Sequence, residues 1–123
     1  MKGLEVGQSA SLTRTFTVED VAEYRALTGD MNAPESVPGP LLGGLLSCVL
    51  GTQLPGRGTN WLKQSYRWGA PAPSGLPITV TVEITRLRPD KQLVNLRNEF
   101  KSTEGAVIGE GETLVSVSDV EAV

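Results

Sequence analysis

The ten residues Leu41–Leu50 read LLGGLLSCVL, and they decide the fold that we expect for this chain. Leucine and valine fill a wide arc of this predicted helix, while small residues recur along it at spacings of three and four. A helix that is apolar on nearly every side is typical of the interior of a domain. Small side chains also allow a sheet or a ligand to approach the helix backbone closely. We therefore predict a buried central helix, with Pro40 as a suitable first residue.

A strand and a helix are expected on the N-terminal side of this central helix. Residues Leu12–Phe16 favour a short strand. Thr17, with Asp20 three residues later, is typical of a capping box and predicts a helix over 18–28. The apolar stripe of that helix should consist of Val21, Tyr24 and Leu27. The prolines and glycines of segment 30–40 predict a loop that leads into the central helix.

Four long strands are expected after the central helix. They are Asn60–Trp68, Ile78–Arg88, Leu93–Lys101 and Val107–Val117. Turn residues between the later segments favour an antiparallel meander. Long antiparallel strands wrapped around one apolar helix make an α+β hot-dog domain, and we expect one such domain over residues 1–123. Such subunits pair, because a sheet that wraps a single helix leaves an open edge.

Composition excludes several classes of function. The net charge is −3 and the basic residues are scattered, which argues against a nucleic-acid partner. The chain contains no histidine and one cysteine, Cys48, so we expect no metal site, no disulfide and no cofactor. The longest apolar run is too short to span a membrane, and the first residues carry no apolar signal segment. We therefore expect a cytoplasmic protein without a membrane partner.

Several segments, in this order and spacing, resemble the MaoC-like family and within it the short (R)-specific enoyl-CoA hydratases. They are Leu4–Gln8, Thr28–Asn32, Leu50–Gly51, Gln53–Gly58, Gln64–Ser65 and Asp90–Lys91. The resemblance covers nearly the whole chain. It implies a hot-dog fold and an enzyme that hydrates a 2-enoyl thioester or dehydrates the 3-hydroxy compound.

The chain differs from this family at the catalytic residues. The family uses a loop aspartate and a histidine a few residues later, after Asn-Pro, to hold and activate water. Asp30 matches the aspartate, but nothing matches the histidine. Asn32 is followed by Ala-Pro instead of Pro, and part of the family's loop has no counterpart. Pro38-Gly39 replaces a second His-Gly pair. The resemblance places Ser47 in the active site and directs the N–H groups around Gly39 toward a thioester carbonyl.

The expected catalytic residues are Asp30 and Ser47, and the expected substrate contacts are Asn32, Gly39, Leu41 and Trp61. Asp30 also fits a simple turn residue, and Ser47 fits a packing residue. Glu35 lies at nearly the offset of the missing histidine, although a solvated loop glutamate is the favoured interpretation. Strand alternation places Tyr66 and Trp68 on one face and Trp61 on the other, unless a bulge intervenes.

The sequence thus predicts a hydratase-lineage protein without the usual Asp/His pair. It would be a lyase or cyclase that acts on an acyl-thioester or polyketide-like substrate in a hydrophobic tunnel, as a homodimer. One alternative is a non-catalytic subunit paired with a histidine-bearing relative. Another is a ligand-binding protein without turnover.

Overall fold

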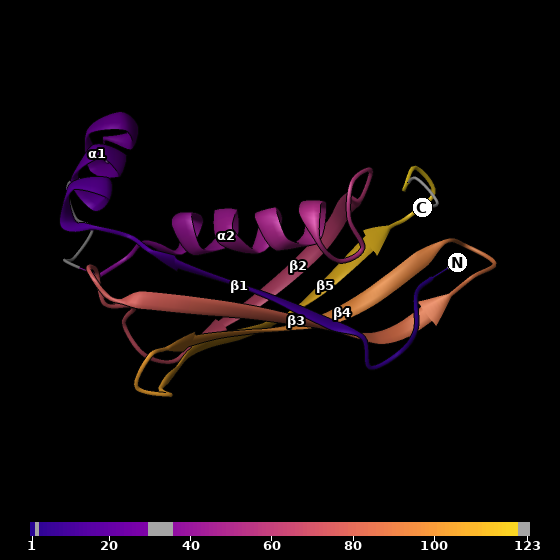
Figure 1. Ribbon diagram of the computed structural model, residues 1–123. Coiled ribbons are helices and arrows are strands. Elements are labelled where there is room, and N and C mark those ends of the chain that lie inside the picture. Colours follow the sequence, from indigo (N-terminus) through magenta and orange to yellow (C-terminus); the bar gives the residue numbers. More distant parts are fainter. Residues whose placement is uncertain (2, 30–35, 121–123) are drawn as a thin grey trace.

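The computed structural model describes residues 1, 3–29 and 36–120 (Figure 1). Its elements, in order, are β1 (Ser9–Thr15), α1 (Val18–Thr28), α2 (Gly39–Thr52), β2 (Asn60–Trp68), β3 (Pro77–Arg88), β4 (Leu93–Ser102) and β5 (Val107–Ser116). The strands form one five-stranded sheet, and α2 lies along one of its faces. This arrangement confirms the predicted α+β hot-dog fold class.

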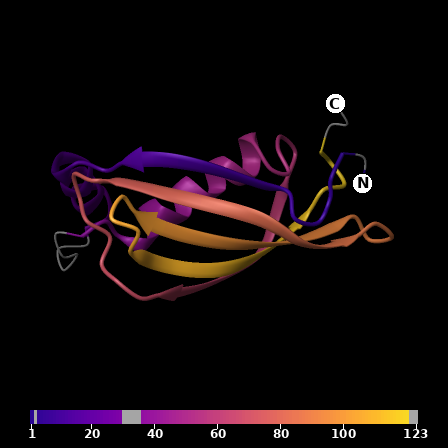
Figure 2. The ribbon, with the colours of Figure 1, turned by 60° about the horizontal axis from the view of Figure 1, so that its bottom comes forward.

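The order of strands in the sheet is β1-β3-β4-β5-β2, and all neighbours are antiparallel (Figure 2). The predicted meander is therefore right for β3, β4 and β5. It is wrong for β2, which pairs with β5 instead of β3. As a result β1 and β2 form the two edges of the sheet. Alternation in a sequence indicates which residues share a face, but it does not indicate which strands become neighbours.

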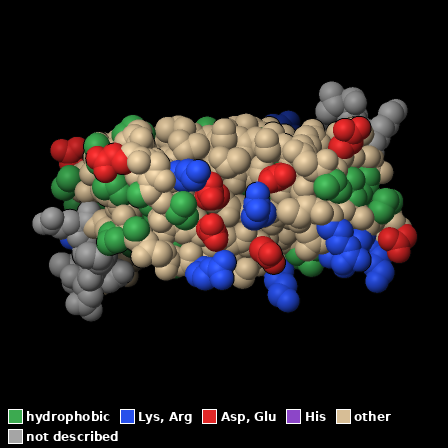
Figure 3. Space-filling view, turned by 90° about the horizontal axis from the view of Figure 1, so that it is seen from below, with side chains coloured by type: hydrophobic (Ala, Val, Ile, Leu, Met, Phe, Trp, Pro, Cys, Tyr) green, Lys and Arg blue, Asp and Glu red, His purple; other side chains and the backbone are tan. Residues whose placement is uncertain are grey.

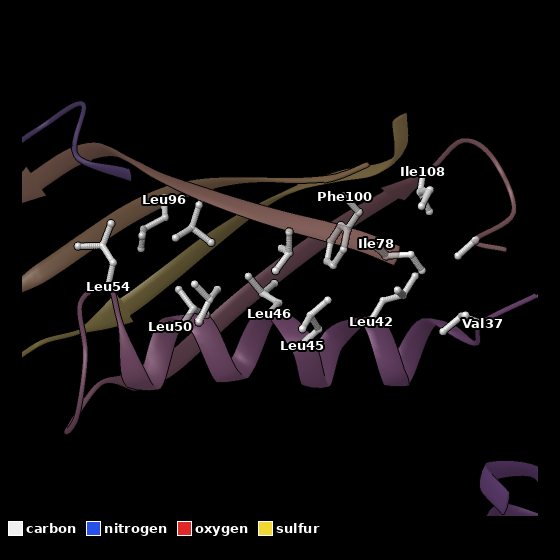
Figure 4. Packing of buried hydrophobic residues seen from close by; sticks show 14 of the residues in the cluster. Val37, Leu42, Leu45, Leu46, Leu50, Leu54, Ile78, Leu96, Phe100 and Ile108 are labelled. Atoms are coloured by element: carbon white, nitrogen blue, oxygen red, sulfur yellow. The ribbon is translucent and has the colours of Figure 1, made fainter. Parts of the chain in front are cut away.

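One side of α2 supplies much of the hydrophobic core. Its buried residues are Leu42, Leu45, Leu46, Val49 and Leu50. They pack against inner-face residues of the sheet such as Ile78, Leu96 and Phe100 (Figure 4). The other side of α2 carries Gly44, Ser47 and Cys48, which are exposed. The prediction of burial on nearly every side is therefore wrong for the single chain, because the sheet covers one side of the helix.

Helix α1 begins and ends as its sequence predicts. The Asp20 N–H donates to Thr17 Oγ1 at 3.0 Å, and the Thr17 N–H donates to Asp20 Oδ2 at 2.9 Å. Gly29 ends the helix with a φ of 75°. The predicted apolar stripe is only partly buried, since Val21 is buried but Leu27 is 87% exposed. The reason is that α1 stands away from the sheet at one end of the molecule (Figure 1).

The outer face of the sheet is a solvent-facing surface. Acidic and basic side chains are interspersed across it (Figure 3). Two cross-strand ion pairs, Arg67–Glu110 at 3.4 Å and Arg97–Glu83 at 2.9 Å, join neighbouring strands. Exposed pairs of this kind contribute little stability. The hydrophobic core lies on the other face, which carries α2.

Two glycines of β5 make room for large side chains on this inner face. Gly109 lies between Phe100 and Trp68 of the neighbouring strands, and Gly111 lies between Asn98 and Tyr66. A Cβ at Gly109 would overlap the indole ring of Trp68. The aromatic side chains of β2 therefore lie across β5 because β5 has no side chains at these positions.

We predict that Gly111→Ala lowers the free energy of unfolding by about 1–3 kcal/mol, the usual cost of forcing extra atoms into a packed site. The new Cβ would overlap the carbonyl oxygen of Ser65 and lie 2.8 Å from Gln64 Nε2. Gly44→Ala is the control, because a Cβ there meets nothing within 4 Å and alanine favours a helix. Urea unfolding of both variants provides the measurement. Equal stability of Gly111→Ala and the wild type would contradict the packing described above.

Candidate functional site

A groove with a volume of about 540 Å³ separates α1 from the exposed side of α2. Its walls come from the end of β1, from α1 and from α2 between Pro40 and Cys48. The lining residues are Arg14, Thr15, Phe16, Asp20, Glu23, Tyr24, Leu27, Pro40, Leu41, Gly44, Leu45 and Cys48. Its size is typical of ligand pockets. Because Gly44 and Cys48 are small, a ligand in this groove can lie close to the backbone of α2.

A smaller pocket, of about 160 Å³, lies beside the N-terminus of α2. We call it the Trp68 pocket. Its lining includes Val37, Gly39, Leu42, Trp68, Ala72 and Ile108. The first turn of α2 separates the two hollows, since Pro40 and Leu41 line the groove whereas Gly39 and Leu42 line the pocket. The Val37 N–H donates to the Ala72 carbonyl at 2.8 Å, which ties the segment before α2 to the loop after β2.

The structure brings two predicted substrate contacts to these hollows. Gly39 is the first residue of α2 and lines the Trp68 pocket. Leu41 is half-buried and lines the groove. Ser47 is exposed on α2 next to Cys48, but it is not part of the lining of the groove. Asp30, Asn32 and Glu35 lie outside the described residues.

A bulge in β2 changes the expected orientation of Trp61. Trp61 pairs with Val115, and Lys63 pairs with the adjacent Leu114, so Leu62 is an extra residue without a partner on β5. Directly opposed residues of an antiparallel pair point to the same face. Trp61 is therefore on the inner face, with Tyr66, and the opposite orientation, predicted for a strand without a bulge, does not apply. Its Nε1 donates to Gln64 Oε1 at 3.2 Å, and it lines neither hollow.

A polar cluster on the inner face was not predicted. It consists of Gln64, Asn98 and Thr113. Gln64 Nε2 donates to Asn98 Oδ1 at 2.7 Å. The Thr113 hydroxyl lies 3.0 Å from Asn98 Oδ1 and within hydrogen-bond distance of Gln64 Oε1, and its single proton donates to one of these oxygens at a time. Asn98 is 1% exposed, and its Nδ2 has no hydrogen-bond partner among the described residues. The signal was present in the sequence, because Asn98 interrupts the apolar alternation between Leu96 and Phe100.

The Tyr66 hydroxyl lies against α2. A Cβ at Gly43 would be 3.1 Å from this oxygen, so the glycine leaves the space that the phenol occupies. Burial raises the pKa of Tyr66 above its ordinary value. The phenol therefore keeps its proton at neutral pH and can donate a hydrogen bond. The hydroxyl groups of Tyr66, from β2, and Ser47, from α2, both lie on the face of the sheet that carries α2.

Other kinds of site find no support in the described part of the chain. Within residues 1, 3–29 and 36–120, no group of three or more His, Cys, Asp or Glu side chains could hold a metal ion. None of the helices in these ranges has the length and apolar character needed to cross a membrane.

Comparison with known proteins assigns the family. No family model matches the chain. It is 35% identical to the (R)-specific enoyl-CoA hydratase of Aeromonas caviae over 130 residues, which cover 94% of this chain and 97% of that protein. It is 36% identical to the (R)-specific enoyl-CoA hydratase of Rhodospirillum rubrum over 129 residues, which cover 93% and 88%. A solved structure, the (R)-hydratase from A. caviae involved in PHA biosynthesis, superposes with a TM-score of 0.88 and covers 94% of this chain and 98% of that one. The chain therefore belongs to the hot-dog family of the (R)-specific enoyl-CoA hydratases, which confirms the resemblance in its sequence.

Proposed function

We propose that this protein is a hydratase-lineage enzyme with altered chemistry, a lyase or cyclase that acts on an acyl-thioester or polyketide-like substrate. One observation carries the proposal. A groove with mainly apolar walls, to which Arg14, Asp20 and Glu23 add charge, runs beside the small-residue side of α2, in a chain that belongs to a hydratase family but contains no histidine. The groove supports binding of a flat apolar ligand, whereas the lack of imidazole argues against ordinary water activation.

The start of α2 is the proposed position of the thioester carbonyl. Pro38 supplies no side-chain cap, and the first turn of α2 contains no acidic residue. The partial positive charge of this helix end is therefore not offset by a carboxylate of the helix's own first turn. An oxygen that gains negative charge during a reaction would be stabilised there by the N–H of Gly39.

The proposed catalytic groups are Asp30 and Ser47. A carboxylate can remove or return a proton without a histidine, and a hydroxyl can orient a polar substrate atom. Positioning of two ends of one flexible substrate would supply much of the remaining rate, as in a cyclisation. Asn32 and Leu41 would contact the substrate. Trp61 stays a proposed substrate contact, although it lines neither hollow and its indole N–H donates to Gln64.

The lack of histidine also favours a second candidate. In this version the chain is a non-catalytic subunit that shapes the acyl site of a histidine-bearing partner, or a binding protein without turnover. The two candidates differ in assembly. An enzyme that works alone should form a homodimer, whereas a supporting subunit should need a different chain.

The edge strand β2 is the proposed contact between two copies. It carries Trp61, Leu62, Tyr66 and Trp68, whose exposed fractions range from 38% to 56%. An unpaired edge with large exposed apolar side chains is a surface that natural proteins usually cover. Pairing of two β2 strands would extend the sheet and bring the exposed sides of two α2 helices close together.

We predict that the purified protein sediments as a dimer of the 13.1 kDa chain, and that Leu62→Arg shifts it toward the monomer. A charge on the edge strand opposes pairing of two identical edges. Leu76→Arg is the matched control, because Leu76 is 44% exposed but precedes β3 and lies on no sheet edge. A wild-type monomer, at concentrations well above those of the assay, would count against the homodimer.

We predict a rate of crotonyl-CoA hydration about 10²–10⁴ lower than that of a histidine-bearing relative, since general acid–base assistance is typically of this size. Absorbance of the enoyl thioester gives the rate in a preparation free of host hydratase. Turnover equal to that of the relative would show that another group replaces the histidine fully.

We predict that Asp30→Asn abolishes turnover of the thioester that the enzyme converts, while its Tm stays within a few degrees of wild type. The change removes the carboxylate and keeps nearly the same shape. Glu35→Gln is the control from the same segment and should keep its turnover. If Glu35→Gln is inactive and Asp30→Asn is active, the proton transfer belongs to Glu35. If Asp30→Asn unfolds the protein, Asp30 is a structural turn residue.

A further inference from the structure

We propose that the hydroxyl groups of Tyr66 and Ser47 together bind an oxygen atom at C3 of an acyl thioester. We call this pair the two-hydroxyl site. The inference rests on the proposed function, because it assumes that the protein binds acyl thioesters. It goes further by assigning a role to Tyr66 and by naming the chemical class of the ligand, a thioester with a hydroxyl or keto oxygen at C3.

The two side chains approach the same side of α2. The Tyr66 hydroxyl comes from β2 and lies 3.1 Å from the position that a Cβ of Gly43 would occupy. Ser47 follows Gly43 by four residues in the same helix. Residues at this spacing lie on one face of a helix, with Cβ atoms about 5–6 Å apart. We therefore expect the two hydroxyls to lie within about one helical turn of each other, so that a ligand oxygen between them can accept from both.

The fold leaves both hydroxyls free. In the described part of the chain, neither the Tyr66 hydroxyl nor the Ser47 hydroxyl forms a hydrogen bond. The ring of Tyr66 is nevertheless held in place, because it stacks on Trp68 with centroids 4.9 Å apart and its centroid lies 6.4 Å from that of Phe100. Tyr66 is 38% exposed and Ser47 is also exposed, so a ligand can reach this side of α2.

The position of the site fits a thioester held at the first turn of α2. Gly39, Gly43 and Ser47 are spaced by four residues, so the start of the helix and the two-hydroxyl site share one side of it. Each four-residue step advances about 6 Å along the helix axis. The C1 and C3 oxygens of one acyl chain lie a few ångströms apart, and each hydrogen bond adds about 2.8 Å. A chain with its carbonyl at the Gly39 N–H can therefore bring its C3 oxygen to Tyr66.

Such a site supplies hydrogen-bond donors that need no histidine. A neutral phenol and a neutral serine hydroxyl can each donate one hydrogen bond. Donation to the C3 oxygen stabilises the negative charge that gathers there as a bond at C3 breaks or forms. The site also distinguishes between ligands, because an acyl chain without the C3 oxygen leaves both hydroxyls without this partner.

The test compares two thioesters of equal chain length, neither of which can add or lose water. Acetoacetyl-CoA has a keto oxygen at C3, whereas butyryl-CoA has none. By calorimetry, the wild type should bind acetoacetyl-CoA more tightly. Tyr66→Phe keeps the ring and its stacking but removes the oxygen. It should reduce this preference about three- to tenfold, the usual size of one neutral hydrogen bond. Ser47→Ala should reduce the preference as well.

A second variant disturbs the site without removing a hydroxyl. Gly43→Ala adds a Cβ that crowds the Tyr66 oxygen, and it should also reduce the preference. Gly51→Ala is its control, because a Cβ there meets nothing within 4 Å and both changes favour the helix equally. Ser65→Ala is the control for the lost hydroxyl, since the side chain next to Tyr66 in β2 points to the opposite face. Both controls should keep the wild-type preference.

The outcomes separate this inference from the proposed function. A reduced preference in Tyr66→Phe and Gly43→Ala, kept in both controls, supports the two-hydroxyl site. If both thioesters bind more tightly than CoA but the wild type shows no preference, or Tyr66→Phe keeps it, the inference is wrong and the proposed function stands. A loss in Ser65→Ala equal to that in Tyr66→Phe also contradicts the inference. If neither thioester binds more tightly than CoA, the inference and the proposed function are both wrong.

Discussion

The packing of one side of α2 against the inner face of the sheet is the interaction on which the rest of the structure depends. Leu46 and Val49 are fully buried there, and so are Ile78 and Phe100 on the facing strands. At about 25 cal/mol for each Å² of apolar surface, such side chains supply the main driving force for folding. The sheet covers one side of α2 and leaves the other side exposed, and the groove lies on that exposed side.

The open side explains why the candidate site lies where it does. Glycine, serine and cysteine expose little apolar surface, so this side of α2 can face solvent, a ligand or a second chain. The large side chains beside the N-terminal part of α2 come from β2. Tyr66 and Trp68 lie over the glycines of β5 and reach Gly43 and Gly39 of α2. Trp68 therefore has two contacts from the same position, since its ring packs against Phe100 and also walls the pocket beside Gly39.

Local features of the fold could be predicted from the sequence, because nearby residues determine them. The capping box of Thr17 and Asp20 fixed the start of α1, and alternation located β2 to β5 within one or two residues. The partner of β2 could not be predicted, since strand neighbours depend on how the whole sheet wraps α2. The position of the bulge at Leu62 could not be predicted for a similar reason, and this bulge turns Trp61 to the other face. For the candidate site, Gly39 and Leu41 line hollows, which leaves their predicted contact with a substrate a prediction, whereas Asn98 was not predicted although it interrupts an apolar pattern.

The central claim is that a hydratase fold without histidine still holds an acyl thioester at the first turn of α2. A crystal structure of the protein with butyryl-CoA tests this most directly. The account predicts the thioester carbonyl within hydrogen-bond distance of the Gly39 N–H, with Asp30 beside the acyl carbons. Density for the ligand on the outer face of the sheet, or a groove between α1 and α2 that stays empty at saturating ligand, would contradict it.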